Sequence, residues 1–145
     1  MKVMSDLEIA KSELCEENLT LAIVKNGSLL YRNKNHRISG FLDAIEKCGA
    51  ALEDASVADK VAGKAVALLC AHAKVKEVYA SMMSRSALAT FKKHKITTHW
   101  GELVENILND DKTGLCPFEK AAERISEPEK ALKTFKELRA SFKKC

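Results

Sequence analysis

The dipeptide Asn26-Gly27 is the feature that most constrains the fold of this chain. It separates two apolar runs, residues 19–25 and 28–31. A type I′ turn needs positive φ at both of its central residues, and Asn followed by Gly adopts these angles readily. The sequence therefore predicts a β-hairpin in the first quarter of the chain.

Helical patterns and single short strands are predicted around this hairpin. Ser5 and Glu8 have the spacing of a capping box, with Leu7, Ala10 and Leu14 on one face of the helix that follows. Later helices are expected over 38–52, 57–73, 84–95, 102–108 and 117–125, and after the Ser126/Glu129 capping box; short strands are expected at 75–80 and 96–100. Alternating strands and helices after a hairpin predict an α/β protein with a small mixed sheet and crossover helices.

Composition limits the classes of protein to which the chain can belong. Its 145 residues are 46% apolar and 30% charged, which is typical of one globular domain. We expect a single domain, 1–145, with its core at about 19–125 and a C-terminal helix at 127–143. The net charge of +4 is mild, and most lysines lie beside acidic residues, so we do not expect a nucleic-acid partner.

Cysteine usage and the N-terminus indicate the compartment. The five cysteines are odd in number and far apart, which is not a disulfide framework and favours a reducing, cytoplasmic location. The first six residues turn polar at once, so no secretory signal is expected. Apolar runs are too short for a membrane span, and no membrane partner is expected.

The stretch 56–70 is the most informative one for function. Taken as a helix, it has one apolar half, and its other half holds Ser56, Asp59, Lys60, Gly63 and Lys64. One interpretation is an anion or carbonyl pocket, with free N–H groups at the helix start, lysine charge, and Asp59 as a base or as the partner of a lysine. The other is structural: Ser56 and Asp59 cap the helix, and Gly63 only permits close packing.

A second stretch, residues 113–119, carries a cysteine just before a helix. Pro117 suits the first helical position, which puts Cys116 at the N-cap. A thiol at a helix N-terminus has a lowered pKa, and Glu119 is spaced to hydrogen-bond back to the cap. The functional interpretation is a reactive or redox-sensitive thiol; the structural one is a buried cysteine that caps poorly.

Metal and phosphate motifs are missing from the sequence. No histidine has a partner at the spacing of a zinc or iron set: His36, His72, His94, His99. Ser81 and Ser84 follow a predicted strand, where pockets of crossover folds open. Neither lies in a nucleophile elbow, and glycine is too sparse for a phosphate loop. We expect no metal and no cofactor.

Two motifs together resemble a small prokaryotic family of unknown function with a cytidine-deaminase-like fold. They are residues 58–65 (Ala-Asp-Lys-Val-Ala-Gly-Lys-Ala) and 113–119 (Thr-Gly-Leu-Cys-Pro-Phe-Glu). The resemblance covers about 19–138 and implies a three-layer α/β/α sandwich whose sheet begins with the hairpin. It also implies that Asp59, Lys60 and Ser84 line the pocket of the fold.

The chain departs from working deaminases of this fold. Zinc deaminases need His-x-Glu or Cys-x-Glu at one crossover helix and Pro-Cys-x-x-Cys at the next. By the resemblance, these positions fall at residues 58–60 (Ala-Asp-Lys) and 83–87 (Met-Ser-Arg-Ser-Ala), and neither segment offers a ligand. If the protein is an enzyme, we do not expect a zinc-dependent deaminase.

Two kinds of function follow from these observations. The first is a metal-free enzyme or sensor for a small polar or nucleotide-like ligand; Cys116, Asp59 and Lys60 would carry the chemistry, and the ligand contacts would be Ser56, Gly63, Lys64, Ser84 and Glu119. The second is a non-catalytic module that forms a homodimer through the Leu/Phe face of the last helix or a sheet edge. An RNA partner has only the mild positive charge in its favour.

Overall fold

The computed structural model describes residues 4–34, 38–108 and 112–143, without the side chains of the last two. Five strands form one sheet in the order β2-β1-β3-β4-β5. Their bounds are β1 Leu21–Lys25, β2 Ser28–Asn33, β3 Ser56–Ala62, β4 Glu77–Ser84 and β5 Thr97–Val104. β1 is antiparallel to both β2 and β3, whereas β3, β4 and β5 run parallel, so the sheet is mixed as predicted.

The predicted hairpin is confirmed as β1 and β2. Asn26 and Gly27 have φ values of 52° and 79°, the positive angles that the turn requires. Their two N–H groups donate to the carboxylate of Asp6, at 2.9 and 2.8 Å. Asp6 is the first residue of α1 (Asp6–Glu16), which begins with the predicted Ser5/Glu8 capping box. The first helix is therefore tied to the tip of the hairpin.

The predicted helix at 57–73 is wrong in its first half. Ser56–Ala62 is the central strand β3, and the helix α3 begins only at Lys64 and ends at Ala73. A central strand is buried on both faces, so its residues do not alternate in polarity and can imitate one half of a helical wheel. The β-branched Val57 and Val61 and the break at Gly63 were the local signs of a strand.

Two crossover helices connect the parallel strands. α3 joins β3 to β4, and α4 (Arg85–Lys93) joins β4 to β5. The strands predicted at 75–80 and 96–100 are confirmed as β4 and β5, but each begins and ends later in the chain than predicted. The helix predicted at 102–108 is wrong, because Glu102, Leu103 and Val104 pair with the end of β4 and extend β5. Strand pairing overrides a helical pattern in so short a segment.

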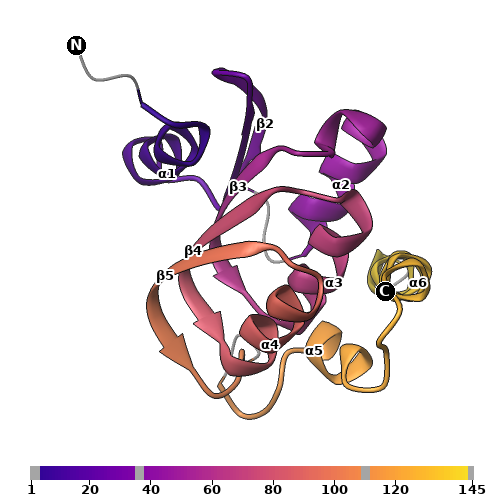
Figure 1. Cartoon of the computed structure of the whole chain (residues 1–145). Coiled ribbons are helices and arrows are strands. Elements are labelled where there is room, and N and C mark those ends of the chain that lie inside the picture. Colours follow the sequence, from indigo (N-terminus) through magenta and orange to yellow (C-terminus); the bar gives the residue numbers. More distant parts are fainter. Residues whose placement is uncertain (1–3, 35–37, 109–111, 144–145) are drawn as a thin grey trace.

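The remaining helices complete the layers of the fold. They are α2 (Ser39–Cys48), the 3-10 turn η1 (Gly49–Leu52), α5 (Pro117–Ala122) and α6 (Pro128–Lys143). α1 lies alone on one face of the sheet, and the other helices cover the opposite face (Figure 1). The predicted three-layer α/β/α sandwich is therefore the observed architecture.

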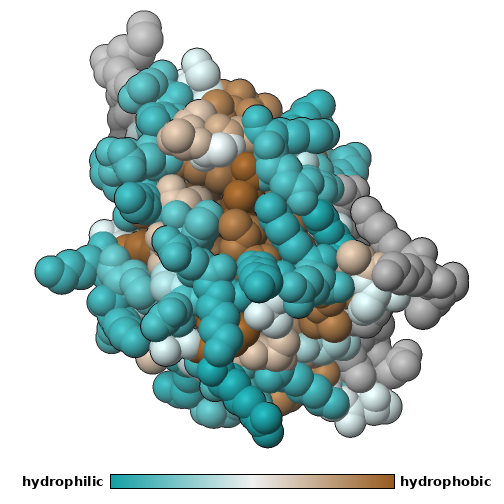
Figure 2. Space-filling model, turned by 90° about the vertical axis from the view of Figure 1, so that its right-hand side faces the viewer, coloured by the Kyte–Doolittle hydropathy of each residue, from teal (hydrophilic) through white to brown (hydrophobic). Residues whose placement is uncertain are grey.

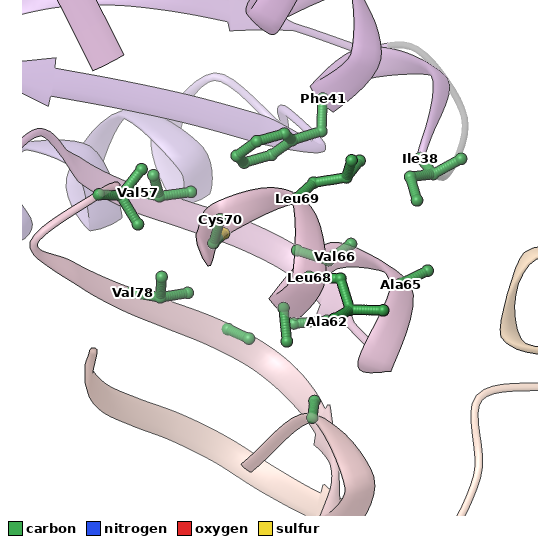
Figure 3. Close-up of a cluster of buried hydrophobic side chains, with 14 of the residues drawn as sticks. Ile38, Phe41, Val57, Ala62, Ala65, Val66, Leu68, Leu69, Cys70 and Val78 are labelled. Atoms are coloured by element: carbon green, nitrogen blue, oxygen red, sulfur yellow. The ribbon is translucent and has the colours of Figure 1, made fainter. Parts of the chain in front are cut away.

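The main core lies between the sheet and α3. Val57 and Val78 of the sheet face Leu69 and Cys70 of α3, and Phe41 of α2 closes the cluster (Figure 3). A smaller core joins α1 to the opposite face through Ala10, Leu14 and Ala58. From the side that carries α6 in Figure 1, a narrow apolar strip is visible between hydrophilic borders (Figure 2). None of the described helices is long and apolar enough to span a bilayer.

Candidate functional site

A cleft of about 240 Å³ lies where β3 passes into α3. Its walls come from β3, the first turn of α3, the start of α5 and the segments beside them. Most lining groups are apolar, and the polar ones come from both sequence motifs and from Thr20. The lining residues are Thr20, Ile38, Asp59, Lys60, Val61, Gly63, Ala65, Val66, Ile107, Cys116, Phe118 and Glu119.

Asp59 is the ionisable group with the most unusual surroundings in this cleft. Alternation along β3 puts it on the same face as the core residue Val57. The backbone N–H of Val61 donates to its carboxylate at 3.2 Å, and no described side chain forms an ion pair with it. Burial raises the pKa of Asp59 to about 7, although backbone N–H groups of Val61 and Lys60 oppose the rise. This carboxyl can take up or release a proton near neutral pH.

Lys60 does not neutralise Asp59. Successive side chains of a strand point to opposite faces, and the Lys60 side chain is exposed. Its backbone N–H donates to the carbonyl oxygen of Thr20, at 3.0 Å. The idea that Asp59 orients this lysine therefore has no contact in the structure to support it, although both residues line the cleft.

Two N–H groups at the start of α3, those of Lys64 and Ala65, are not free for a ligand. The backbone N–H groups of Lys64 and Ala65 each donate to one oxygen of the Glu119 carboxylate, both at 2.8 Å. The sequence predicts that Glu119 hydrogen-bonds back to the cap of its own helix, and this is wrong. Glu119 instead caps α3, whose first residue lies 55 residues earlier in the chain. Burial raises the pKa of Glu119 in spite of these two bonds and the charge of Lys64.

Cys116 lies at the predicted N-cap of α5 and reaches the same cleft as Asp59. Its side chain is buried, and its backbone N–H donates to the carbonyl oxygen of Ile107 at 3.1 Å. Cys116 makes no side-chain capping hydrogen bond. The structure thus brings Asp59, Lys60, Gly63, Cys116 and Glu119 together around one hollow.

Three predicted ligand contacts lie outside the cleft. Ser56 is at the opposite end of β3, where its hydroxyl donates to Glu77 at 2.6 Å; it caps no helix. Ser84 is the N-cap of α4 and accepts from the N–H of Ala87 at 3.1 Å. The Lys64 ammonium lies 3.4 Å from the carbonyl oxygen of Glu123, beside a neighbouring hollow of about 190 Å³.

Sequence reasoning missed several walls of the cleft. Thr20, Ile38, Ile107 and Phe118 all line it. Ile38 was visible only as the start of a predicted helix, and Ile107 fell inside the helix wrongly expected at 102–108. No local pattern relates these four positions, since they are far apart in the sequence and meet only in the tertiary fold.

The residues at the helix starts do not fit the zinc set of a deaminase. The first crossover helix begins at Gly63-Lys64-Ala65, later than the position expected from the resemblance, and the second begins at Ser84-Arg85-Ser86. None of these side chains is a usual zinc ligand. Within the described ranges, no three His, Cys, Asp or Glu residues are grouped so that they could hold a metal ion. His36 lies outside those ranges.

Comparisons with known proteins agree with this architecture. The structure is similar to that of a DUF1893 family protein (TM1506) from Thermotoga maritima, with a TM-score of 0.83 and 23% identity over 92% of this chain and 90% of that one. It is also similar to Acinetobacter baumannii RibD, with a TM-score of 0.50 and 17% identity over 58% of this chain and 28% of that one. No curated protein matches the sequence.

A family model gives the assignment. The model TM1506, a domain of unknown function (DUF1893), matches residues 9–138, which is most of the chain. The fold, with its hairpin, mixed sheet and crossover helices, is cytidine-deaminase-like. The protein therefore belongs to the DUF1893 family.

Proposed function

We propose that the protein binds a small nucleotide-like molecule in the cleft, with amino or ring N–H groups of the ligand donating to Asp59. The observation that carries this proposal is the carboxyl itself. It lines a mostly apolar cleft, has no cation beside it among the described residues, and has a pKa of about 7. A ligand that supplies hydrogen-bond donors would satisfy a group that the protein leaves under-satisfied.

The size of the cleft limits what it can enclose. Ligand pockets for drug-sized molecules are roughly 300–1,000 Å³, and this cleft has about 240 Å³. It suits a single heterocyclic ring between apolar walls such as Ile107 and Phe118. The rest of a nucleotide-like ligand would extend outward, and the exposed Lys60 at the border is suited to an anionic group.

A covalent step through Cys116 is part of the proposal. The thiol and Asp59 line the same cleft. The Asp59 carboxylate would accept the thiol proton, and the sulfur would add to an electrophilic ring carbon to form a C–S bond. The electron pair of the attacked double bond would move to its nitrogen or oxygen, which would take the proton back from Asp59.

Binding can be tested with a panel of nucleobases, nucleosides and nucleotides. We expect at least one member to raise the melting temperature of the wild type, and Asp59→Asn to weaken that ligand at least tenfold by calorimetric titration. Asp54→Asn is the matched control, because Asp54 is exposed and has a positive φ that asparagine tolerates. A panel without a binder, or equal affinity in Asp59→Asn, would reject the proposal.

A second candidate is a homodimerisation module. It is favoured by β5, which among the described strands pairs only with β4 at the edge of the sheet, and by Trp100 on that strand, which is 39% exposed. The Leu/Phe face of α6 is a weaker candidate surface, because Phe135 is fully buried against the core. Light scattering that gives a dimer for wild type, and for Asp59→Asn and Cys116→Ala alike, would favour this function.

A further inference from the structure

We propose that Glu119 is a positioning residue: it ties α5 to the first turn of α3 and thereby holds Cys116 at the cleft. The inference rests on the proposed function, because it concerns how a group of the ligand site is held in place. It also explains why the two sequence motifs occur in one chain, since the acidic end of the second motif binds the helix start that follows Gly63 in the first.

The contact between Glu119 and α3 is close and buried. Both carboxylate oxygens accept a backbone N–H, from Lys64 and Ala65, at 2.8 Å, and Glu119 is 8% exposed. The first N–H groups of a helix have no partner within the helix. A negative side chain there is stabilised by these donors and by the helix dipole. Glu119 therefore supplies the cap that α3 does not provide for itself.

Gly63 is the residue that makes room for this contact. A Cβ atom added to Gly63 would overlap the Glu119 carboxyl group, and the closest atom it would meet is Oε1. The backbone of Gly63 is extended, with φ −102° and ψ −174°, which any residue can adopt. Glycine is therefore needed at this position for space beside Glu119 and not for a special backbone angle.

Glu119 and Cys116 are joined by a short and well-defined piece of backbone. The carbonyl oxygen of Cys116 accepts the N–H groups of Glu119 at 2.9 Å and Lys120 at 3.0 Å. Pro117 fixes φ at the first position of α5. Because only one helical turn separates the carboxylate from the thiol, moving Glu119 away from α3 would move Cys116 relative to Asp59.

A double-mutant cycle tests the contact without any ligand. Gly63→Ala alone and Glu119→Ala alone should each lower the melting temperature by several degrees. In the Glu119→Ala background, Gly63→Ala should lower it hardly at all, because the added methyl group enters the space that the carboxylate has left. Additive losses would overturn the contact. If Glu119→Ala does not fold, Glu119→Asp replaces it: the side chain is one methylene shorter and withdraws from Gly63, so Gly63→Ala should again cost less in this background than in wild type.

The positioning role is tested by the rate at which iodoacetamide alkylates Cys116. Mass spectrometry measures this rate separately for the peptide that contains each cysteine. Gly63→Ala should raise the rate at least tenfold, since Cys116 is buried, with 5% of the residue exposed, in the native protein. Glu119→Gln should give a smaller rise than Glu119→Ala. Cys48, which is partly exposed on α2, is the internal control and should not change. An unchanged Cys116 rate in every variant would overturn the positioning role even if the cycle shows coupling.

These outcomes are separable from a failure of the proposed function. Neither the cycle nor the alkylation rate needs a bound ligand. The cycle repeated in Asp59→Asn should give the same coupling, because Asp59 makes no hydrogen bond with Glu119. A panel without a binder would therefore reject ligand binding and leave the role of Glu119 standing, whereas additivity would reject that role and leave binding untouched.

Discussion

The two crossover helices begin in different ways, although both follow a parallel strand at the same end of the sheet. α4 is capped by Ser84, the residue directly before it, which accepts the N–H of Ala87 at 3.1 Å. α3 is preceded by Gly63, which has no side chain, and the N–H groups of Lys64 and Ala65 donate to Glu119 from a distant helix. The cap of α4 thus comes from the adjacent residue, whereas the cap of α3 comes from a residue that is distant in sequence and reaches it by a tertiary contact.

The difference shows which helix start belongs to the cleft. Ser84 lies outside it and only completes its own helix, whereas Gly63 and Glu119 both line it. A local cap keeps its partner whatever the rest of the chain does. A tertiary cap places a buried carboxylate, and the segment that carries it, against the wall of a cavity.

The sharpest test of this comparison is Glu119→Ala. It leaves two N–H donors of α3 without their partner, and charge-assisted hydrogen bonds are the strong ones. We expect the free energy of unfolding, measured by urea denaturation at pH 7, to fall by about 3 kcal/mol. A loss no larger than that of a surface substitution would mean that water replaces the carboxylate at little cost.

The next largest effect is the pH dependence of stability. It should come from the cleft, which holds titratable groups, and not from the cap of α4, which has none. Burial raises the pKa of Asp59 from 3.8 to about 7 and also raises the pKa of Glu119. The folded protein then holds protons that the unfolded chain releases, so stability falls as the pH rises from about 4 to about 7.

Asp59→Asn should remove most of this pH dependence. We expect the free energy of unfolding of the variant, relative to that of wild type, to rise by about 2 kcal/mol from pH 5 to pH 8, because the neutral amide has no proton to release and no charge to desolvate. Urea denaturation across this pH range measures it, with Asp54→Asn again as the exposed control. Parallel curves for wild type and Asp59→Asn would show that the carboxyl is well hydrated.

The smallest expected effect is that of Ser84→Ala, which removes the local cap of α4. Loss of an N-cap serine costs about 1 kcal/mol. The stability curve should shift downward without a change of shape, since no titratable group is involved, and the reactivity of Cys116 should stay as in wild type. A change in Cys116 alkylation would contradict the separation between the two helix starts.

Much of the fold could be predicted from local sequence. The hairpin turn, the capping box of α1 and the proline that opens α5 are set by residues a few positions apart, and each was found where expected. The wrong assignments, residues 56–62 and 102–104, are strands whose identity depends on their neighbours in the sheet. Their pairing partners on β4 lie far from them in the sequence and cannot be seen in a local pattern.

The residues of the candidate site could be predicted from the sequence better than the contacts between them. The sequence indicates Asp59 and Glu119 as carboxylates, Gly63 as a small residue in a polar stretch, and Cys116 as a thiol before a proline. Their arrangement was not visible, because the partner of Glu119 lies 55 residues earlier in the chain. The sequence places Ser56 at the pocket because it puts the start of the first crossover helix too early, and Ser84 because it follows a predicted strand and by the family resemblance.

The mutual fit of Gly63 and Glu119 has a consequence for how this sequence can diverge. Each residue restricts the other: a larger residue at Gly63 displaces the carboxylate, and loss of the carboxylate removes the need for glycine. Substitutions at the two positions should therefore arise in pairs among descendants of this protein, with the acidic residue lost first. The residues found at positions 63 and 119 of a related sequence therefore indicate whether this wall of the cleft is retained.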